Sequence, residues 1–430
     1  MADPSVSVFR HTAGIAAIVT ALALAGSRPA CGYALYTHTG MIDLAWDDAI
    51  RPMLLERFPS LTEAALREAH AFAYGGCLIQ DLGYYPFGKA LFSDLTHYVR
   101  SGDFVDALFR NARNANEYAF AIGALSHFVG DSIGHSQAIN RATPMTFPKL
   151  EKKYGPVVTY EQDRVAHGRT EFGFDVAQIG WHRYASHAYR EYIGFRVALG
   201  VLDRAFFETY GLTVHSVLGP RRSAIASYRF SVRKLLPKFV VAEVINNRSR
   251  LPTEIQNPAL REYLARIDST EYFRKWGGTY RGQRGFVVHA MAILIRIIPK
   301  IGVLKILSIK PPSSATEDLF IASVNNAMDH FRTRLAQVAA APSAGLTLPN
   351  RDLDTGEGVR PGSYILTDKT YEKLLAKITA QPGMKVPPGL RENILLYYSD
   401  PNAPIHTKKN KKAWKRVLAE LENLRANGGD

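Results

Sequence analysis

The sequence predicts an all-α fold, and three features of the chain support this prediction. Apolar residues recur at three- and four-residue spacing through most of the chain, which is the period of an amphipathic helix. Runs of alternating, β-branched residues, which are typical of strands, are scarce. The 430 residues are 47% hydrophobic and 21% charged, so the chain has a globular composition and enough length for a large core.

The helical pattern can be followed along most of the chain. In order, the predicted helices span 41–57, 61–73, 104–113, 117–140, 181–210, 222–247, 258–267, 285–307, 316–339, 368–379, 390–398 and 411–426. Prolines border the stretch 251–257, and 341–363 is rich in Pro, Gly and Asp, as linkers are. We therefore expect a helical domain over 31–250, a helical extension over 251–340, and a linker with a basic helical tail over 341–430.

The N-terminus has the features of a secretory signal peptide. Arg10 and His11 precede an apolar run over 13–26, and small residues and a proline follow up to Ala30. The run is too short for a comfortable transmembrane helix. We expect cleavage after Ala30, which makes 1–30 the signal peptide and Cys31 the first mature residue. The protein would then be secreted or periplasmic, with lipidation of Cys31 as a weaker alternative.

The charge balance favours anionic partners. The chain has 53 Lys and Arg against 39 Asp and Glu, a net charge of +14. Phospholipid headgroups, membrane surfaces and nucleic acid would all suit this charge, and a soluble protein with a high pI needs none of them. The tail concentrates lysines on what we expect to be a solvated face, namely Lys408, Lys409, Lys411, Lys412 and Lys415. No feature points to an obligate protein partner.

The segment 285–307 is strongly apolar, with Arg296, Lys300 and Lys305 as its positive charges. It has two interpretations. It could lie at a lipid interface, or it could be a buried core helix that is broken or kinked at Pro299. We favour the buried helix, because only a few charges punctuate the run.

The central chemical feature is the segment from His127 to His135, with Asp131 midway. Residues four apart share one face of a helix, so these three side chains form a single stripe. The two histidines are separated by roughly 12 Å along the axis, too far for one zinc ion with ligand bonds near 2 Å. Asp131 could bridge two ions, so the stripe predicts a metal cluster rather than a single site.

Other residues of metal-binding type accompany the stripe. His167 and Glu171 form a second pair at helical spacing. His38, Asp81 and His97 lie upstream, each of a type that is more often structural when it stands alone. The chain has two cysteines, Cys31 and Cys77, which one disulfide could join, and no CxxC pattern. A metal would therefore be held mainly by histidines and carboxylates.

This set of residues resembles the zinc-dependent phospholipase C family. The resemblance covers Cys31 to Phe174 and rests on Cys31-Gly32, Thr37-His38, Asp81, His97, the stripe and the later His-x3-Glu pair. The short Asp131–His135 spacing is similar to the phospholipase-like domain of glycosylphosphatidylinositol-specific phospholipase D proteins, whereas bacterial phospholipases usually have five residues between the Asp and the His. The resemblance implies a multi-helix bundle like that of phospholipase C and P1 nuclease, with a C-terminal helical extension here.

The resemblance also implies three Zn2+ ions and their ligands. One ion would take Asp81, His97, His127 and Asp131, and a second would take His135, His167 and Glu171. The third would take His38, the bridging Asp131 and the N-terminal amine and carbonyl of Cys31. A phosphodiester would bind across the ions, with Asp81 as a ligand and as the general base for the attacking water.

The function that we expect is therefore a phospholipase C that releases a phosphorylated headgroup from phospholipid. The first alternative is an S1/P1-like zinc nuclease, which would share the fold and much of the cluster and would suit the basic charge. The opening Trp that is usual in those nucleases is absent here. The second alternative is a secreted, non-catalytic module in which zinc is structural.

Overall fold

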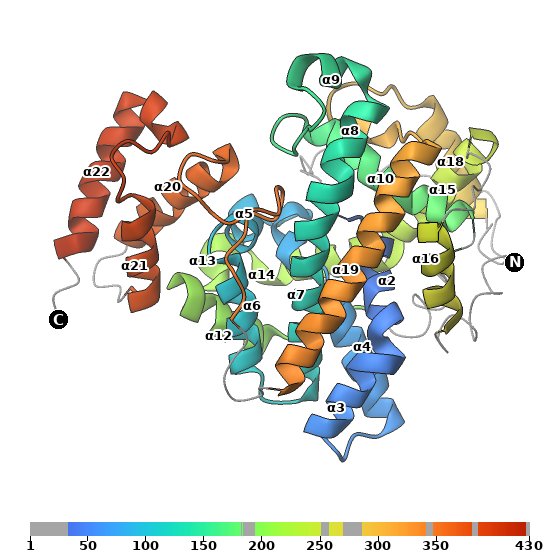
Figure 1. Cartoon of the computed structure of the whole chain (residues 1–430), viewed down its shortest axis with the longest axis horizontal. Coiled ribbons are helices and arrows are strands. Elements are labelled where there is room, and N and C mark those ends of the chain that lie inside the picture. Colours follow the sequence, from blue (N-terminus) through green and yellow to red (C-terminus); the bar gives the residue numbers. More distant parts are fainter. Residues whose placement is uncertain are drawn as a thin grey trace, which may run out of the picture.

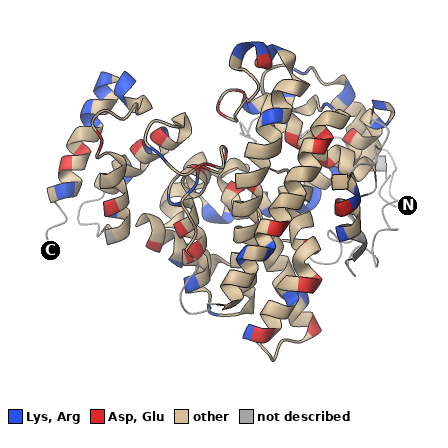
Figure 2. Cartoon of the chain, in the orientation of Figure 1, with Lys and Arg blue, Asp and Glu red and all other residues tan. Residues whose placement is uncertain are grey.

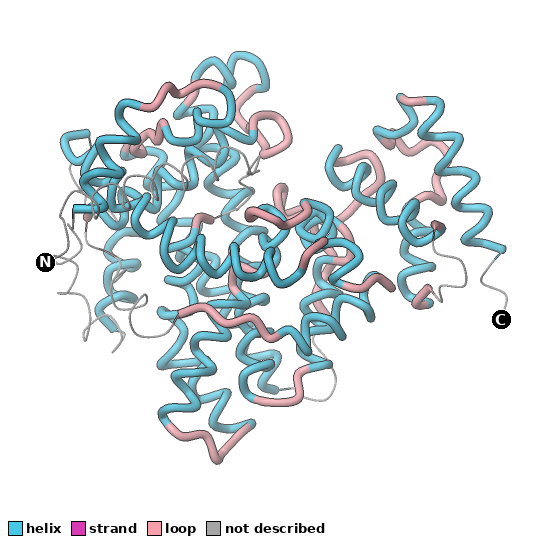
Figure 3. Tube along the Cα trace, turned by 180° about the vertical axis from the view of Figure 1, so that it is seen from behind, coloured by secondary structure: helices cyan, strands magenta, loops and turns pink. Residues whose placement is uncertain are grey.

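The computed structural model describes residues 33–181, 183, 194–250, 258–269, 286–340, 347–380 and 386–426. Over these residues the secondary structure is helical, without a strand, and an isolated antiparallel bridge joins Arg351 to Gly358 (Figure 3). The predicted all-α fold is therefore confirmed. None of the helices in the described ranges combines the length and apolarity that crossing a membrane would require.

Figure 1 shows how the elements are arranged along the chain. The first half contains α2 (Leu35–Ala45), η1 (Trp46–Ile50), α3 (Arg51–Arg57), α4 (Glu63–Gly76), η2 (Gln80–Tyr84), α5 (Ala90–Tyr98), α6 (Ser101–Asn111), α7 (Ala115–Gly134), η3 (His135–Ile139), α8 (Asn140–Thr146), α9 (Pro148–Tyr154), α10 (Arg164–Gly180), α12 (Leu199–Tyr210) and α13 (Val214–Leu218). The second half contains α14 (Arg221–Phe230), η4 (Ser231–Leu235), α15 (Leu236–Asn247), η5 (Arg248–Arg250), α16 (Pro258–Ser269), α18 (Phe286–Ile297), η7 (Gly302–Leu307), α19 (Ser314–Ala340), α20 (Ile365–Thr379), α21 (Pro388–Tyr397), η8 (His406–Lys409) and α22 (Lys411–Ala426).

Most predicted helices are present, and two need correction. The helix predicted over 181–210 is wrong at its start, because 194–198 is not helical and α12 begins at Leu199. Gly194 has φ +82°, and the backbone N–H of Arg196 donates to the carbonyl of Ala71 instead of to a helical partner. Residues 184–193 lie outside the described ranges. The helix predicted over 285–307 ends at Ile297 and resumes as η7, since Pro299 has no N–H to donate.

Helix α7 lies in the middle of the main body, and α4, α6 and α19 pack around it (Figure 1). Its crossing with α4 is very close. A Cβ atom at Gly123 would lie 2.1 Å from the carbonyl oxygen of Ala73, and one at Gly76 would lie 2.0 Å from that of Phe120. Only glycine can occupy both positions, so these two residues set the depth at which α7 lies in the core.

Side-chain caps fix where three helices around the site begin. Asn114 accepts a hydrogen bond of 3.0 Å from the N–H of Glu117 at the start of α7. Asp163 caps α10 by accepting from Ala166, and Thr62 caps α4 by accepting from Ala65. Such caps satisfy N–H groups that have no partner within the helix. They therefore set the register of α7 and α10, which carry most of the candidate site.

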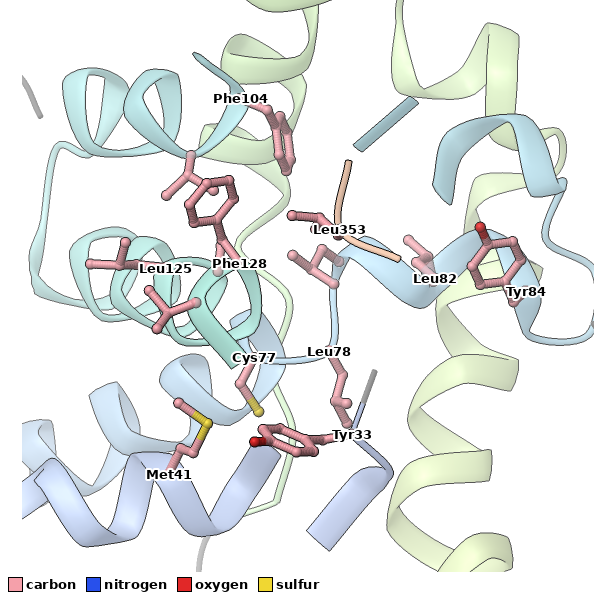
Figure 4. Packing of buried hydrophobic residues seen from close by; sticks show 14 of the residues in the cluster. Tyr33, Met41, Cys77, Leu78, Leu82, Tyr84, Phe104, Leu125, Phe128 and Leu353 are labelled. Carbon is pink, nitrogen blue, oxygen red and sulfur yellow. The ribbon is translucent and has the colours of Figure 1, made fainter. Parts of the chain in front are cut away.

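The C-terminal segment reaches back to the main body. Helix α20 packs against α5 and α22 packs against α20, so α20–α22 form a separate group at one end of the molecule (Figure 1). The stretch 347–363, part of the predicted linker, is ordered in a specific place. Its Leu353 is fully buried in the same cluster of side chains as Leu82 and Phe128 (Figure 4). The predicted domain boundaries themselves remain predictions.

The basic tail agrees with the predicted solvated face. Lys409, Lys411, Lys412 and Lys415 are exposed at the end of η8 and on the first turns of α22 (Figure 2). Lys408 is half-buried, and its Nζ donates to the backbone carbonyls of Pro401 and Ala403 at 2.6 and 2.5 Å.

Candidate metal centre

Six elements bring eight side chains of metal-binding type together inside the main body. The first six are His38 from α2, Asp81 from η2, His97 from α5, and His127, Asp131 and His135 from α7 and the start of η3. The other two, His167 and Glu171, come from α10. Each is at most 1% exposed. The structure therefore assembles every predicted ligand except Cys31, which lies outside the described residues.

Asp131 is the centre of the first group. Its Oδ1 lies 3.1 Å from Nε2 of His38, and its Oδ2 lies 3.1 Å from Nε2 of His127 and 3.4 Å from Nε2 of His97. Asp81 joins the same group, with its Oδ1 3.4 Å from Nε2 of His97. The atoms of this group that could hold an ion fall into two overlapping sets, which share His127.

His135, His167 and Glu171 form the second group. Oε1 of Glu171 lies 3.1 Å from Nε2 of His167 and 3.7 Å from Nε2 of His135. The ring centroids of the two histidines are 5.0 Å apart. The helix changes to π-helical geometry at His135, and such bulges are frequent at functional sites. The stripe thus divides between the two groups, with His127 and Asp131 in the first and His135 in the second.

Backbone carbonyls orient three of the imidazoles. Nδ1 of His97 donates to the carbonyl of Ser93 at 2.8 Å, and Nδ1 of His127 donates to that of Cys77 at 3.0 Å. Nδ1 of His135 donates to the carbonyl of Leu353 at 2.8 Å. Because a carbonyl oxygen can only accept, each Nδ1 carries a proton, so in the neutral form of these rings Nε2 presents its lone pair to the group. Metal-ligating histidines are held in this way.

The geometry within the groups fits a metal ion better than it fits hydrogen bonds. Nε2 of His97 and Nε2 of His127 face each other at 3.4 Å, although both rings already donate through Nδ1. In the described part of the chain, neither carboxylate oxygen of Glu171 and neither ring nitrogen of His167 has a hydrogen-bond partner. Two ligands of one tetrahedral zinc ion lie roughly 3.3 Å apart, since each bond is near 2 Å. Acceptors spaced in this way suit a shared cation.

The electrostatics also favour a cation. Burial alone would raise the pKa of Asp131, but the neighbouring rings of His127, His38 and His97 hold it well below its usual range. Burial and the neighbouring His127 lower the pKa of His38. Asp131 is therefore an ionised carboxylate beside an imidazole that prefers its neutral form. A neutral imidazole and an ionised carboxylate are the forms that bind a metal.

Two contacts position the start of α2, where His38 lies. The carboxylate of Asp175 accepts from the N–H of Tyr36 at 2.8 Å and from the hydroxyl of Thr37 at 3.0 Å. The ring of Tyr33 packs edge-on against His38, with a centroid distance of 5.9 Å. The same ring would block a Cβ atom at Gly134, which lies one residue before His135. The first described residues of the chain therefore lie against the stripe.

Several residues at the centre were not predicted from the sequence. Asp354, next to Leu353, lies with its Oδ1 4.0 Å from Nδ1 of His135. Its other oxygen accepts from the hydroxyls of Tyr98 and Tyr364 at 2.9 and 2.6 Å. The alternation Asp352-Leu353-Asp354 is the only local signal for this role. It stands in a stretch whose Pro, Gly and Asp content is typical of linkers, so composition obscures it.

A comparison with known protein families found a match for part of the chain. Residues 37–218 match the family model for zinc-dependent phospholipase C. No curated protein and no solved structure matches the chain. The eight side chains of the two groups all lie within the matched residues, whereas Leu353 and Asp354 lie outside them. The resemblance is confirmed over this segment, and the class of activity it indicates is that of a phosphodiesterase-type hydrolase.

Proposed function

From the membership of residues 37–218 in the zinc-dependent phospholipase C family, we propose that the protein is a zinc-dependent phospholipase C. It would cleave the phosphodiester of a phospholipid on the glycerol side and release the phosphorylated headgroup. The observation that carries the proposal is the pair of buried histidine and carboxylate groups, with nitrogen–oxygen distances of 3.1 to 3.7 Å around Asp131 and Glu171.

The proposed ligand sets follow the two groups, with three zinc ions in all. Asp81, His97, His127 and Asp131 would hold one ion, and His135, His167 and Glu171 a second. Asp131 reaches toward His38 with its other oxygen, so it would also serve the third ion. When bound, zinc ions lower the pKa of a coordinated water and stabilise charge on phosphoryl oxygens. The backbone carbonyls that accept from Nδ1 of His97, His127 and His135 keep the Nε2 atoms of these rings facing the ligand groups.

Asp81 is the residue that we propose as the general base. It is fully buried on the short helix η2, and its Oδ1 lies 3.4 Å from Nε2 of His97. A carboxylate at the edge of the ligand set can both bind an ion and accept the proton of the attacking water. The proton would leave the water for Asp81 as the water oxygen bonds to phosphorus, and the glyceride oxygen would depart on the opposite side and take up a proton from solvent to become the alcohol.

We also propose that the protein is exported and that cleavage after Ala30 supplies the amine of Cys31 to the third ion. The packing of Tyr33 against His38 supports this, because Tyr33 is two residues from Cys31. Intact mass of the exported protein tests it. A mature chain that begins at Cys31 with a free amine should bind three zinc ions. A form with one added N-terminal residue should bind two, and equal zinc content in both forms would contradict the role of the amine.

A surface feature favours lipid over nucleic acid as the substrate. Ile293, Ile297 and Ile301 are 62%, 69% and 69% exposed and follow one another at four-residue intervals on and after α18. Arg296 and Lys305 are exposed in the same segment. Apolar side chains flanked by cations suit the interface of an anionic membrane. The favoured interpretation of 285–307 as a core helix broken at Pro299 agrees with the buried face of α18, which includes Val288, Met291 and Ile295, while the face with Ile293 and Ile297 is exposed.

The deciding experiment combines metal analysis with substrate cleavage on the purified, exported protein. Mass spectrometry counts zinc, and the same sample is given phosphatidylcholine vesicles and single-stranded DNA. Close to three zinc ions with release of phosphocholine would support the phospholipase. Zinc with cleavage of DNA alone would support the nuclease, and zinc without any hydrolysis would support a structural module. A protein purified without chelators that lacks zinc would overturn the proposal.

A further inference from the structure

The second metal-binding group has an unusual tyrosine beside it. Tyr160, in the connection between α9 and α10, packs its ring edge-on against His167 with a centroid distance of 5.7 Å. The residue is only 2% exposed. Its hydroxyl has no hydrogen-bond partner in the described part of the chain. A buried hydroxyl without a partner is costly, so the position calls for a group that the protein itself does not provide.

Three other tyrosines near the two groups differ from Tyr160, because their hydroxyls do have hydrogen-bond partners. The hydroxyls of Tyr98 and Tyr364 both donate to Asp354, and that of Tyr84 donates to Asp94 at 3.3 Å. The rings of Tyr84 and Tyr98 each lie 5.9 Å from that of His97. Tyrosines thus border both groups, and among these four only Tyr160 keeps its donor uncommitted.

A cation lies over the same ring. The guanidinium carbon of Arg164, at the start of α10, is 5.2 Å from the ring centroid of Tyr160. Arg164 is half-buried and forms no ion pair within the described ranges. The pKa of Tyr160 is raised well above its usual range by burial, Arg164 opposes that rise, and Asp354, Glu171 and Asp94 add to it. The ring of Tyr160 thus contacts both the guanidinium of Arg164 and the imidazole of His167.

One of the carboxylates whose charge influences this pair, Asp94, is already paired with a cation. Asp94 accepts from Nζ of Lys373 at 3.0 Å, and the lysine reaches it from α20. An anion that approached Arg164 would thus meet a paired carboxylate instead of a free one. A half-buried arginine without a carboxylate partner is suited to a phosphate, because the guanidinium can give it two parallel hydrogen bonds.

We propose that Tyr160 and Arg164 form a phosphate-binding pair beside His135, His167 and Glu171. The Tyr160 hydroxyl would donate to one phosphoryl oxygen and Arg164 would neutralise another, while the remaining oxygens face the ions. The identity of the substrate rests on the proposed function, but the affinity for a phosphate group does not. The pair would stay bound to the phosphoryl group while the negative charge on its oxygens changes during the reaction. An uncharged ester would have no such negative charge for the pair to bind.

The test measures binding of inorganic phosphate to the zinc-loaded, exported protein by calorimetry. Tyr160→Phe keeps the ring against His167 and removes the donor, and Arg164→Gln removes the charge. Each should weaken phosphate binding by about tenfold to hundredfold, the usual effect of losing a hydrogen bond to a charged group. Zinc content should not change. Arg113→Gln is the matched control, since it removes the same charge from an exposed residue before the first turn of α7.

Three results would overturn the proposal. They are the absence of phosphate binding in the unaltered zinc-loaded protein, unchanged affinity in both variants, and loss of zinc in Tyr160→Phe, which would mean that the hydroxyl supports the ligands instead. Failure of the proposed function would look different. Phosphate binding would still depend on Tyr160 and Arg164, but neither lipid nor DNA would be cleaved.

Discussion

Nδ1 of His135 donates a hydrogen bond of 2.8 Å to the backbone carbonyl of Leu353, a residue that lies 218 positions further along the chain. The N–H of Leu353 in turn donates to the carbonyl of His97 at 3.1 Å. One residue of the C-terminal segment therefore links histidines of the two metal-binding groups. Leu353 lies outside the matched family segment, so a region beyond that segment contributes to the centre.

Gly356→Ala should therefore damage the centre from outside the matched segment. Gly356 has φ +73°, and a Cβ atom there would lie 2.2 Å from the carbonyl oxygen of Ser132. The loop would have to move away from α7, which would pull Leu353 from His135. We expect the free energy of unfolding to fall by about 1–3 kcal/mol and one zinc ion to be lost. Gly358→Ala is the control, because nothing lies within 4 Å of a Cβ there. Equal zinc content in the two variants would contradict the role of the loop.

Asp131→Asn and Glu171→Gln should remove different numbers of ions. Asp131 contacts His38, His97 and His127, so its loss should cost two of three zinc ions. Glu171 contacts only the His135 and His167 pair of ligands, so its loss should cost one. Hydrolysis should fall by more than about a hundredfold in both, since even the partners of metal ligands contribute 10- to 100-fold. Mass spectrometry of the native proteins gives the counts. Full zinc occupancy and activity in Asp131→Asn would remove the basis for the proposed centre.

Ile297→Asp should weaken binding to anionic lipid vesicles while leaving the fold intact. The side chain is 69% exposed, so the change alters the surface and not the core. Burying an isoleucine in an apolar phase contributes about 1.5–3 kcal/mol, so the affinity should fall about tenfold or more. Leu396→Asp on α21 is the matched control, with an exposure of 73%. Co-sedimentation with vesicles measures both. Similar losses in the two variants would mean that α18 has no special part in membrane contact.

The stability of the protein should depend on pH through Asp106. Burial raises the pKa of this α6 carboxyl from 3.8 to about 7, although its Oδ2 accepts from the N–H of Leu348. Between these two values the folded state binds more protons than the unfolded state, so stability falls as the pH rises toward 7. Asp106→Asn should therefore be more stable relative to the unaltered protein at pH 8 than at pH 5. Thermal unfolding at the two pH values measures this. A pH-independent difference would show that Asp106 titrates normally.

The sequence pattern was enough to predict the long helices and the side chains that share one helix face, because both depend on residues close together in the chain. The period of apolar residues predicted α4, α6, α7 and α19 to within a few residues, and the four-residue spacings placed His127, Asp131 and His135 on one face. Short elements were missed, such as α5 and η2, which carry His97 and Asp81. A helix of five to nine residues has too few turns to show a period, and tertiary packing stabilises it.

Contacts between distant segments could not be predicted in this way. Nothing near Leu353 shows that its carbonyl faces His135, and nothing near Tyr160 shows that its hydroxyl lacks a partner. Gly123 and Gly76 are ordinary helix-weakening residues in the sequence, and only the crossing of α4 and α7 gives them a purpose. Periodicity describes one element at a time, whereas the centre depends on how six of them meet.

The hydrogen bond between His135 and Leu353 has a consequence for biosynthesis. The ribosome adds about 5–20 residues per second, so roughly 10–45 s separate the synthesis of these two residues. Once Glu171 has been added, the nascent chain contains all eight side chains of the two groups, yet His135 lacks the carbonyl that orients it until residue 353 follows. Messages cut short before this point would give a polypeptide with a complete set of ligands and an unfinished centre. Translation to residue 353 is thus a condition for maturation of the enzyme.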